Sequence, residues 1–221
     1  MAQAEIQRHN PNNENLLQRD LLQRDLHLVQ ITDAAFADAA QRSGPHLVCK
    51  PGCTQCCHGA FAIHALDAWR LRQGFKELAQ RDPYRAQAVR TRAEQYIRVY
   101  ASTFPGDPVS GILGLSEAEQ EAFEEFANEA ACPALDPASG LCDLYTARPM
   151  TCRVFGPPVR SMDEDGAEGL GHCELCFIGA TPEQVAACEM PVPGLGEELV
   201  EEFEQSSGRR GHTLVAFALA R

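Results

Sequence analysis

The chain has 221 residues and a formal net charge of −12, from 31 acidic and 19 basic side chains. This charge argues against binding to the phosphate backbone of nucleic acids, which depends on clustered lysine and arginine. Because 44% of the residues are hydrophobic, the chain can bury a core and does not need the disulfides that stabilise small secreted domains.

The N-terminal residues 1–14 are polar and contain no apolar segment. They predict a disordered N-terminus and no secretory signal. An apolar run of about 18 residues is absent from the sequence, so we expect no membrane-spanning helix and no membrane partner. We therefore expect a cytoplasmic protein, and in that reducing compartment its ten cysteines are more typical of metal ligands than of disulfides.

Apolar residues recur at helical spacing through the first half of the chain. From about Asn15 to Arg42, where LLQRD occurs twice in succession, the spacing predicts one amphipathic helix or two short ones. Helical patterns follow in AFAIHALDAWRLRQGFKEL and in DPYRAQAVRTRAEQYIRVYAS, where Asp82 precedes Pro83 as a cap. FPGDPVSGILGL is predicted to be a loop. Ser116 and Glu119 then have the spacing of a capping box, which predicts another helix.

The helical periodicity disappears between Ala131 and Met190, where Pro, Gly and Cys dominate and strands would have to be short. A last helix in LGEELVEEFEQSS and an apolar end, HTLVAFALA, close the chain. We predict a mainly α fold with few or no short strands. Its expected parts are the disordered 1–14, a helical extension over 15–45, a cysteine-cluster metal-binding domain over 46–190, and a C-terminal helix and apolar tail over 191–221 that pack on this domain.

Four cysteines lie close together in the segment CKPGCTQCC: Cys49, Cys53, Cys56 and Cys57. Pro51 and Gly52 occupy the positions that these residues prefer in a type II turn, which would fold Cys49 back towards Cys53. A helix that began at Cys53 would then place Cys56 and Cys57 on one face. Because crowded thiolates repel one another unless a cation lies between them, this segment predicts a metal site.

A second group of cysteines is spread over the irregular segment: Cys132, Cys142, Cys152, Cys173 and Cys176. Cys132 precedes a proline, and Cys173 and Cys176 form a Cys-x-x-Cys pair; both arrangements recur around zinc and iron–sulfur clusters. Metal bound by these thiols would stabilise a segment that has few apolar residues, since metal binding contributes to the folding free energy. We expect Cys188, outside both groups, to be a buried and inert side chain.

Two histidines and two arginines adjoin these cysteines. His58 and His172 are either ligands or neighbours that face solvent or hydrogen-bond to the ligands. Arg148 and Arg153 flank Cys152, and two roles stay open for them. They could offset the negative charge of a thiolate-bound cluster, as cofactor-binding residues, or form ion pairs with carboxylates.

Two blocks of this sequence carry a resemblance to a known family. One block is Cys49-Lys-Pro-Gly-Cys53-Thr-Gln-Cys56-Cys57. The other contains Cys132-Pro133, Gly140-Leu-Cys142 and Tyr145-x-x-Arg148-Pro149-x-x-Cys152-Arg153. Together, over about Cys49 to Cys176, they resemble the bacterial CxxCxxCC family, described as chelating zinc or iron, although the first gap here is three residues rather than two. The resemblance implies a mostly helical metal-binding domain.

The same resemblance implies an alternative function. Some larger relatives are flagellin lysine N-methylases, which look like cluster-dependent methyl transferases. The resemblance therefore implies, as the alternative, a group transferase that acts on protein or peptide. Whether this shorter chain is an enzyme is left open.

The spacing Cys49-x3-Cys53-x2-Cys56 is also similar to that of radical S-adenosylmethionine enzymes, which hold a [4Fe–4S] cluster. Those enzymes place the motif after the first strand of a partial β/α barrel. The flanks of the motif are helical in this sequence, and neither an alternating βα pattern nor a Gly-Gly-Glu-like segment follows it. S-adenosylmethionine therefore stays a cofactor without support from the sequence.

The identity of the metal stays open between zinc and iron. A closed structural zinc site takes four N or S ligands, so nine cysteines suffice for two sites. Alternatively, four cysteines hold one [4Fe–4S] cluster, and the others bind zinc or lie near the cluster. Side chains of adjacent residues diverge by about 100° on a helix, so Cys56 and Cys57 suit one tetrahedral zinc poorly, which favours iron–sulfur.

We expect a metal-binding protein in which the metal or cluster has a structural, redox or metal-handling role. The sequence contains no Gly-rich phosphate loop and no G-x-S-x-G nucleophile motif. A protein partner that meets the acidic faces is a further alternative.

Overall fold

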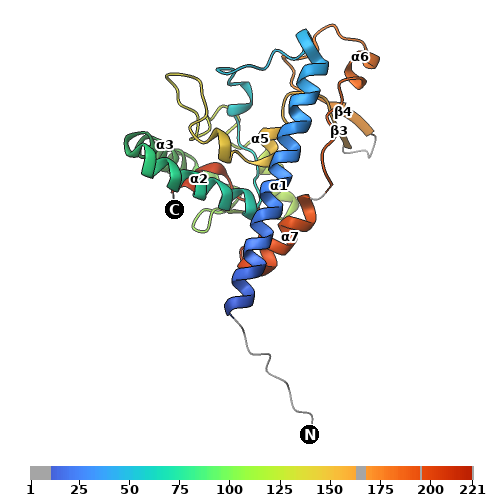
Figure 1. Ribbon diagram of the computed structural model, residues 1–221. Helices are drawn as coiled ribbons and strands as arrows, with labels where there is room; N and C mark the ends of the chain where they lie inside the picture. Colours follow the sequence, from blue (N-terminus) through green and yellow to red (C-terminus); the bar gives the residue numbers. More distant parts are fainter. Residues whose placement is uncertain (1–10, 163–167, 195, 221) are drawn as a thin grey trace.

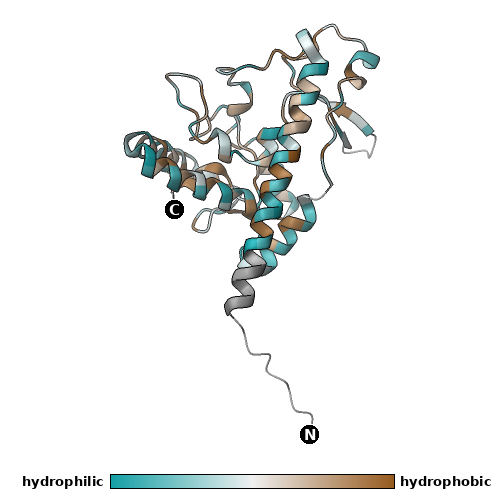
Figure 2. Ribbon diagram, viewed as in Figure 1, coloured by the Kyte–Doolittle hydropathy of each residue, from teal (hydrophilic) through white to brown (hydrophobic). Residues whose placement is uncertain are grey.

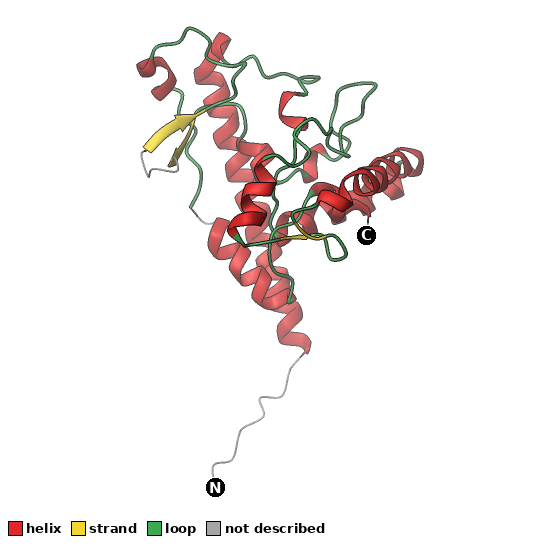
Figure 3. Cartoon of the chain, turned by 180° about the vertical axis from the view of Figure 1, so that it is seen from behind, coloured by secondary structure: helices red, strands yellow, loops and turns green. Residues whose placement is uncertain are grey.

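The computed structural model describes residues 11–162, 168–194 and 196–220 (Figure 1). Helices dominate the fold, as Figure 3 shows, which confirms the predicted mainly α class. Strands within the described ranges form two antiparallel pairs. Most of the predicted disordered segment 1–14 lies outside the described residues. None of the described helices combines the length and the apolar character that crossing a bilayer requires.

Eight α-helices follow one another in the described part of the chain: α1 (Pro11–Ser43), α2 (Ala65–Arg81), α3 (Pro83–Tyr100), α4 (Glu117–Glu124), α5 (Met150–Val154), α6 (Pro182–Ala186), α7 (Gly196–Ser207) and α8 (Val215–Ala220). The strands are β1 (Gly106–Asp107), β2 (Ile112–Leu113), β3 (Val159–Met162) and β4 (Glu168–Gly171). Short 3₁₀ helices are η1 (Gly44–His46), η2 (Gln55–Cys57), η3 (Ala101–Thr103) and η4 (Tyr145–Ala147).

Helix α1 is one long helix that runs along a side of the molecule, with α7 beside it (Figure 1). It begins at Pro11, four residues before the predicted start. The prediction of one helix is therefore confirmed, and the alternative of two short helices is wrong. Teal and brown residues alternate along it in Figure 2, as expected for an amphipathic helix. Leu21 and Leu28 are buried against Leu66 of α2 and Phe203 of α7.

Helices α2, α3 and α8 surround the main core. Leu71 of α2, Val89 of α3 and Leu219 of α8 are buried there together. Asp82 caps α3, as its place before Pro83 predicts, and its carboxylate accepts the backbone N–H of Arg85 at 3.0 Å. The apolar end of the chain therefore completes the core as helix α8.

Two differences from the predicted elements have a common cause. Helix α2 begins at Ala65 rather than near residue 60, and the predicted loop 104–115 contains the β1–β2 pair. Ile63 exchanges backbone hydrogen bonds with Thr213, at 2.8 and 2.9 Å, and Ile112 bridges to Thr213 as well. Because these bonds come from the distant C-terminal segment, local sequence patterns do not predict them.

Sequence signals for the later helices are confirmed. Ser116 and Glu119 form the predicted capping box at the start of α4, and α7 occupies the predicted last helix. The irregular segment 131–190 contains only short elements in its described part. Within it, β3 and β4 pair with Val159 opposite Gly171 and Met162 opposite Glu168.

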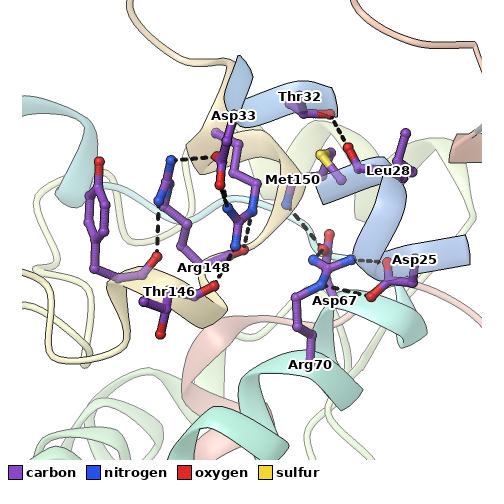
Figure 4. Close-up of polar contacts among 11 residues, drawn as sticks. Asp25, Leu28, Thr32, Asp33, Asp67, Arg70, Thr146, Arg148 and Met150 are labelled. Carbon is purple, nitrogen blue, oxygen red and sulfur yellow. Dashed lines mark hydrogen bonds and ion pairs between the residues drawn. The ribbon is translucent and has the colours of Figure 1, made fainter. Parts of the chain in front are cut away.

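Buried ion pairs attach this irregular segment to the helices (Figure 4). Asp67 of α2 is buried; its carboxylate accepts the backbone N–H of Met150 at 3.0 Å and pairs with the Arg70 guanidinium. Arg70 also binds Asp25 of α1, with one hydrogen bond of 3.1 Å. Asp67 therefore joins α1, α2 and the first turn of α5, the helix that carries Cys152.

We expect Asp67→Ala to lower the free energy of unfolding by about 3 kcal/mol. The substitution leaves the buried Arg70 guanidinium with one carboxylate fewer and the Met150 N–H without its acceptor. Urea titration of the metal-free protein under reducing conditions measures this change. The control is Asp38→Ala, whose carboxylate is 65% exposed in its pair with Arg42, and its cost should stay below about 0.5 kcal/mol. Equal effects of the two substitutions would contradict this role of Asp67.

Candidate metal centre

The first cysteine segment begins with the predicted turn. The Cys53 N–H donates to the Lys50 carbonyl at 2.9 Å, and Gly52 has φ +90°. A positive φ at the third position defines a type II turn and favours glycine there. The predicted turn between Cys49 and Cys53 is thus confirmed.

The predicted helix at Cys53 is wrong. Thr54 has φ −116° and ψ 2°, and only the single 3₁₀ turn η2 follows, over Gln55–Cys57. The chain becomes extended again at His58. Cys56 and Cys57 are the last two residues of this turn, and each thiol shifts the pKa of the other.

The structure divides nine of the cysteines into two groups. We call the first the five-thiol group: Cys56, Cys57, Cys132, Cys142 and Cys152. We call the second the four-thiol group: Cys49, Cys53, Cys173 and Cys176. The expected convergence of three or four sulfurs of CKPGCTQCC is corrected to two pairs, since the 3₁₀ turn that follows Thr54 separates Cys49 and Cys53 from Cys56 and Cys57.

In the five-thiol group, backbone hydrogen bonds bring Cys57 beside Cys132. The Cys132 N–H donates to the Cys57 carbonyl at 2.7 Å, and the Gly59 N–H donates to Ala130 at 3.0 Å. Cys142 joins them through a bridge to Leu135, and the Leu135 N–H donates to the Cys132 carbonyl at 2.9 Å. Cys132 and Cys142 both pack against the main core.

An arginine of α3 holds the segment that carries Cys132 and Cys142. The Arg92 guanidinium donates to the Pro133 carbonyl at 2.8 Å and to the Asp143 carboxylate at 2.5 Å. Asp143 also binds Arg85, and its side chain is 1% exposed. Arg92 thus contacts the residue that follows each of these two cysteines.

Cys152 lies on the short helix α5, which α1 and α2 hold in place. Besides the contact between Asp67 and Met150, the Arg153 guanidinium binds both carboxylate oxygens of Asp33, at 2.7 and 2.9 Å. Arg148 reaches Asp33 at 3.0 Å (Figure 4). Two ion-pair systems therefore fix the backbone on either side of Cys152.

Backbone amides donate to several of the sulfurs. Leu144 donates to the Cys142 sulfur, Ala134 and Leu135 to that of Cys132, and Leu175 to that of Cys173. Hydrogen bonds to a thiolate stabilise its charged form, and they surround the sulfurs of metal–thiolate sites. The local backbone around these three cysteines is therefore arranged for thiolates.

Burial opposes this effect when no metal is bound. It raises the pKa of the Cys132 thiol to about 12, and it raises the pKa values of Cys152 and Cys142. Cys56 differs, because the hydrogen bond from Cys57 lowers its pKa while the pKa of Cys57 rises. A bound cation would stabilise the thiolate forms and so lower the pKa values of the buried thiols.

The four-thiol group joins the first cysteine segment to the Cys-x-x-Cys pair. Cys49 packs on the apolar cluster that contains the buried Cys173 and Cys176, and its thiol hydrogen-bonds with that of Cys176. The Cys173 N–H donates to the Gly156 carbonyl at 3.2 Å. A Cβ atom at Gly156 would lie only 3.4 Å from the Cys49 sulfur.

All ten cysteines are free thiols. Within residues 11–162, 168–194 and 196–220, no group of three or more His, Cys, Asp or Glu side chains is arranged to hold a metal ion as it stands. The sulfurs of each group are neighbours that metal binding would have to draw together.

A cavity of about 370 Å³ lies between the two groups. Its wall includes Cys56 and Cys152 of the five-thiol group and Cys173 of the four-thiol group, with Phe61 and Phe155 as apolar lining. It is large enough for a small organic molecule. The cavity therefore gives such a molecule access to two thiols of the five-thiol group.

The structure separates the roles left open for neighbouring residues. Arg148 and Arg153 both bind Asp33, which favours the ion-pair alternative. The Nδ1 atoms of His58 and His172 donate hydrogen bonds to the backbone carbonyls of Thr54 and Cys173, at 3.0 and 3.1 Å. Both histidines also line the cavity.

Cys188 is buried in the apolar cluster with Cys173 and Cys176. Its surroundings agree with the expected apolar packing, and its inertness stays a prediction. It also supplies a matched control for substitutions of its neighbours in that cluster.

Sequence reasoning missed the side chains that anchor the cysteines: Asp33, Asp67, Arg92 and Asp143. Asp143 directly follows Cys142 and is the one with a local signal. Each of the others contacts a group far along the chain; Asp33 and Arg153, for example, are 120 positions apart. Charged residues on amphipathic helices usually face solvent, so the sequence pattern alone does not indicate these contacts.

We expect Cys56 to be the most rapidly alkylated thiol of the five-thiol group in the metal-free protein at pH 7. The thiolate is the reactive form, and each unit of pKa changes its fraction by up to about tenfold. Iodoacetamide labelling with peptide mass spectrometry should show Cys56 reacting at least about tenfold faster than Cys132. Raising the pH to 9 should narrow this difference, because the other thiols begin to ionise.

Cys57→Ala is the control for this reactivity. It removes the hydrogen bond that lowers the pKa of Cys56, so Cys56 should react more slowly at pH 7. An unchanged rate, or equal rates for Cys56 and Cys132 in the unsubstituted chain, would contradict the assignment.

The comparison with known protein families agrees with the chemistry of these thiols. Residues 48–168 match the CxxCxxCC family, described as a putative zinc- or iron-chelating domain. This match contains the whole five-thiol group, together with Cys49 and Cys53. No curated protein and no solved structure matches the chain. Because the match covers more than half of the chain, the protein belongs to the CxxCxxCC family of zinc- or iron-chelating domains.

Proposed function

We propose that the protein is an iron–sulfur protein whose five-thiol group holds a [4Fe–4S] cluster. The supporting observation is that three separate segments present five cysteines to one another. Buried charge anchors the segments of Cys142 and Cys152 to helices, and backbone hydrogen bonds join the Cys56–Cys57 segment to Cys132. Cys56, Cys132, Cys142 and Cys152 would be the ligands, since the charge on Cys152 interacts with the other three. Cys57 would lie beside the cluster and hydrogen-bond to Cys56.

The surroundings of the sulfurs favour iron–sulfur over zinc at this group. A tetrahedral zinc and a [4Fe–4S] cluster both take four thiolates, but the backbone amides that donate to the sulfurs of Cys132 and Cys142 are the surroundings expected for a cluster. Bound here, the cluster would supply redox or Lewis-acid chemistry. The residues of this chain would set its surroundings, through the amides of Ala134 and Leu144 and the apolar packing of Cys132 and Cys142.

Metal analysis of the full chain, purified without oxygen, tests the proposal. We expect about four irons and four sulfides per chain at this group. Cys132→Ala, Cys142→Ala and Cys152→Ala should each lose most of the iron, because each removes one cluster ligand. Cys188→Ala is the control and should keep the iron. Cys57→Ala should keep the iron and change only the absorption spectrum.

The opposite pattern would contradict the proposal. Zinc without iron in anaerobically purified protein would favour a zinc protein. Iron that persists after Cys56 and Cys57 are both replaced by alanine would show that the cluster lies elsewhere.

The cavity favours a second candidate function, that of a cluster-dependent group transferase. It is lined by Cys56 and Cys152, so a small molecule bound there would lie next to the proposed cluster. A purely structural cluster has no need of such access. The walls combine the Phe61 and Phe155 rings with the Thr151 hydroxyl and the Glu174 carboxylate, a mixture suited to an organic molecule with polar groups.

Titration of the iron-loaded protein with S-adenosylmethionine tests this second function. Binding in the cavity should change the electron paramagnetic resonance spectrum of the reduced cluster. Phe61→Trp should weaken that change by filling the cavity, while the iron content stays constant. A spectrum that does not respond to S-adenosylmethionine would remove the methyltransferase version of this function.

A further inference from the structure

The four-thiol group lies across the boundary of the matched family domain. Cys49 and Cys53 belong to the matched residues 48–168, whereas Cys173 and Cys176 follow them. The group therefore cannot be assigned from the family match, and its four sulfurs need an explanation of their own.

Each half of this group is a tight turn with one cysteine at its end and a second cysteine at or just before its start. In the first half, the Cys53 N–H closes the turn on Lys50, the residue after Cys49, at 2.9 Å. In the second, the Cys176 N–H donates to the Cys173 carbonyl at 2.8 Å, while the Leu175 N–H points at the Cys173 sulfur. Two such turns, each with two cysteines two to four residues apart, are how tetrahedral zinc is commonly bound.

Backbone and side-chain contacts hold the two turns against each other. The Phe177 N–H, directly after Cys176, donates to the His46 carbonyl at 2.8 Å. Gln55 donates to the Glu174 carboxylate at 2.7 Å. Contacts on both sides of the four sulfurs therefore fix the register of the two segments.

Gly156 and Phe177 have unusual backbone conformations where their segments lie against Cys49 and Cys176. Gly156 has φ +130°, a backbone conformation that residues with a side chain rarely adopt, and a methyl group there would touch the Cys49 sulfur at 3.4 Å. Phe177 has φ +60°, a backbone conformation that residues other than glycine rarely adopt. Strain of this kind persists only where the surroundings fix it, and it is common at binding sites.

The chemistry of the group matches one metal best. Four sulfur donors in two short turns are the number and kind of ligands that a closed tetrahedral Zn²⁺ site takes, and metal binding would draw them together without the bridging sulfides of a cluster. The Cys173 and Cys176 side chains are buried with Phe177 and Cys188, so a bound ion would be shielded from solvent.

We propose that Cys49, Cys53, Cys173 and Cys176 form a second metal site, which holds a structural zinc ion. This site fastens the 172–176 segment to the 49–55 loop. His172, Cys173 and Glu174 of that segment line the cavity opposite Cys56 and Cys152. The zinc thus holds one wall of the cavity in place beside the five-thiol group.

Metal analysis of paired variants of the full chain tests this site. The Cys173→Ala/Cys176→Ala double variant should lose about one zinc ion per chain and keep its iron. Cys188→Ala is the matched control, because Cys188 is buried in the same apolar cluster, and it should keep both metals. Since zinc and iron are counted separately, failure of the zinc site and failure of the proposed cluster are distinguishable. Unchanged zinc in the double variant would overturn the proposal.

A footprint of the unsubstituted protein decides the case if the double variant does not fold. Cysteines are alkylated before and after treatment with a zinc chelator, and the modified peptides are identified by mass spectrometry. We expect the four thiols to become reactive together only after chelation. Their reaction before chelation, or a disulfide between any two of them, would overturn the zinc site.

Discussion

The carboxylates of Asp33 and Asp67 fix the part of the structure on which the candidate site depends. Helix α5 has five residues, too few for a stable isolated helix. Asp67 accepts the Met150 N–H at its start, and Asp33 binds Arg153 within it. The place of Cys152 is therefore set by side chains of α1 and α2 rather than by the local sequence.

This arrangement bears on the role of Arg153. Its side chain is 1% exposed, and it donates to the Thr146 and Arg148 carbonyls as well as to Asp33. Burial lowers the pKa of the guanidinium, which the Asp33 carboxylate opposes. Moving Arg153 towards a bound cluster would leave Asp33 and two carbonyls without this donor, at a cost of several kcal/mol. Arg148 is less constrained, and its charge already acts on Cys142.

Sequence reasoning predicted those features that depend on local chemistry. The type II turn at Gly52, the Asp82 cap and the Ser116 capping box each rest on contacts within a few residues. The division of CKPGCTQCC between two groups could not be predicted, because it depends on which distant segments meet each pair. Cys57 meets Cys132, and Cys49 meets Cys176. The anchors Asp33 and Arg92 escaped prediction for the same reason.

The two thiol groups solve a problem of charge that a single group of nine would not. Thiolates repel one another, and each bound cation offsets only the sulfurs next to it. Dividing the nine thiols lets each group take its own metal, while Cys56 and Cys152 of the five-thiol group and Cys173 of the four-thiol group line the cavity between them. A closed site suits a structural ion, and an accessible one suits chemistry. Because Cys173 and Glu174 belong to the cavity wall as well as to the segment of the four-thiol group, loss of the proposed zinc ion should alter access to the five-thiol group before it alters that group's own ligands.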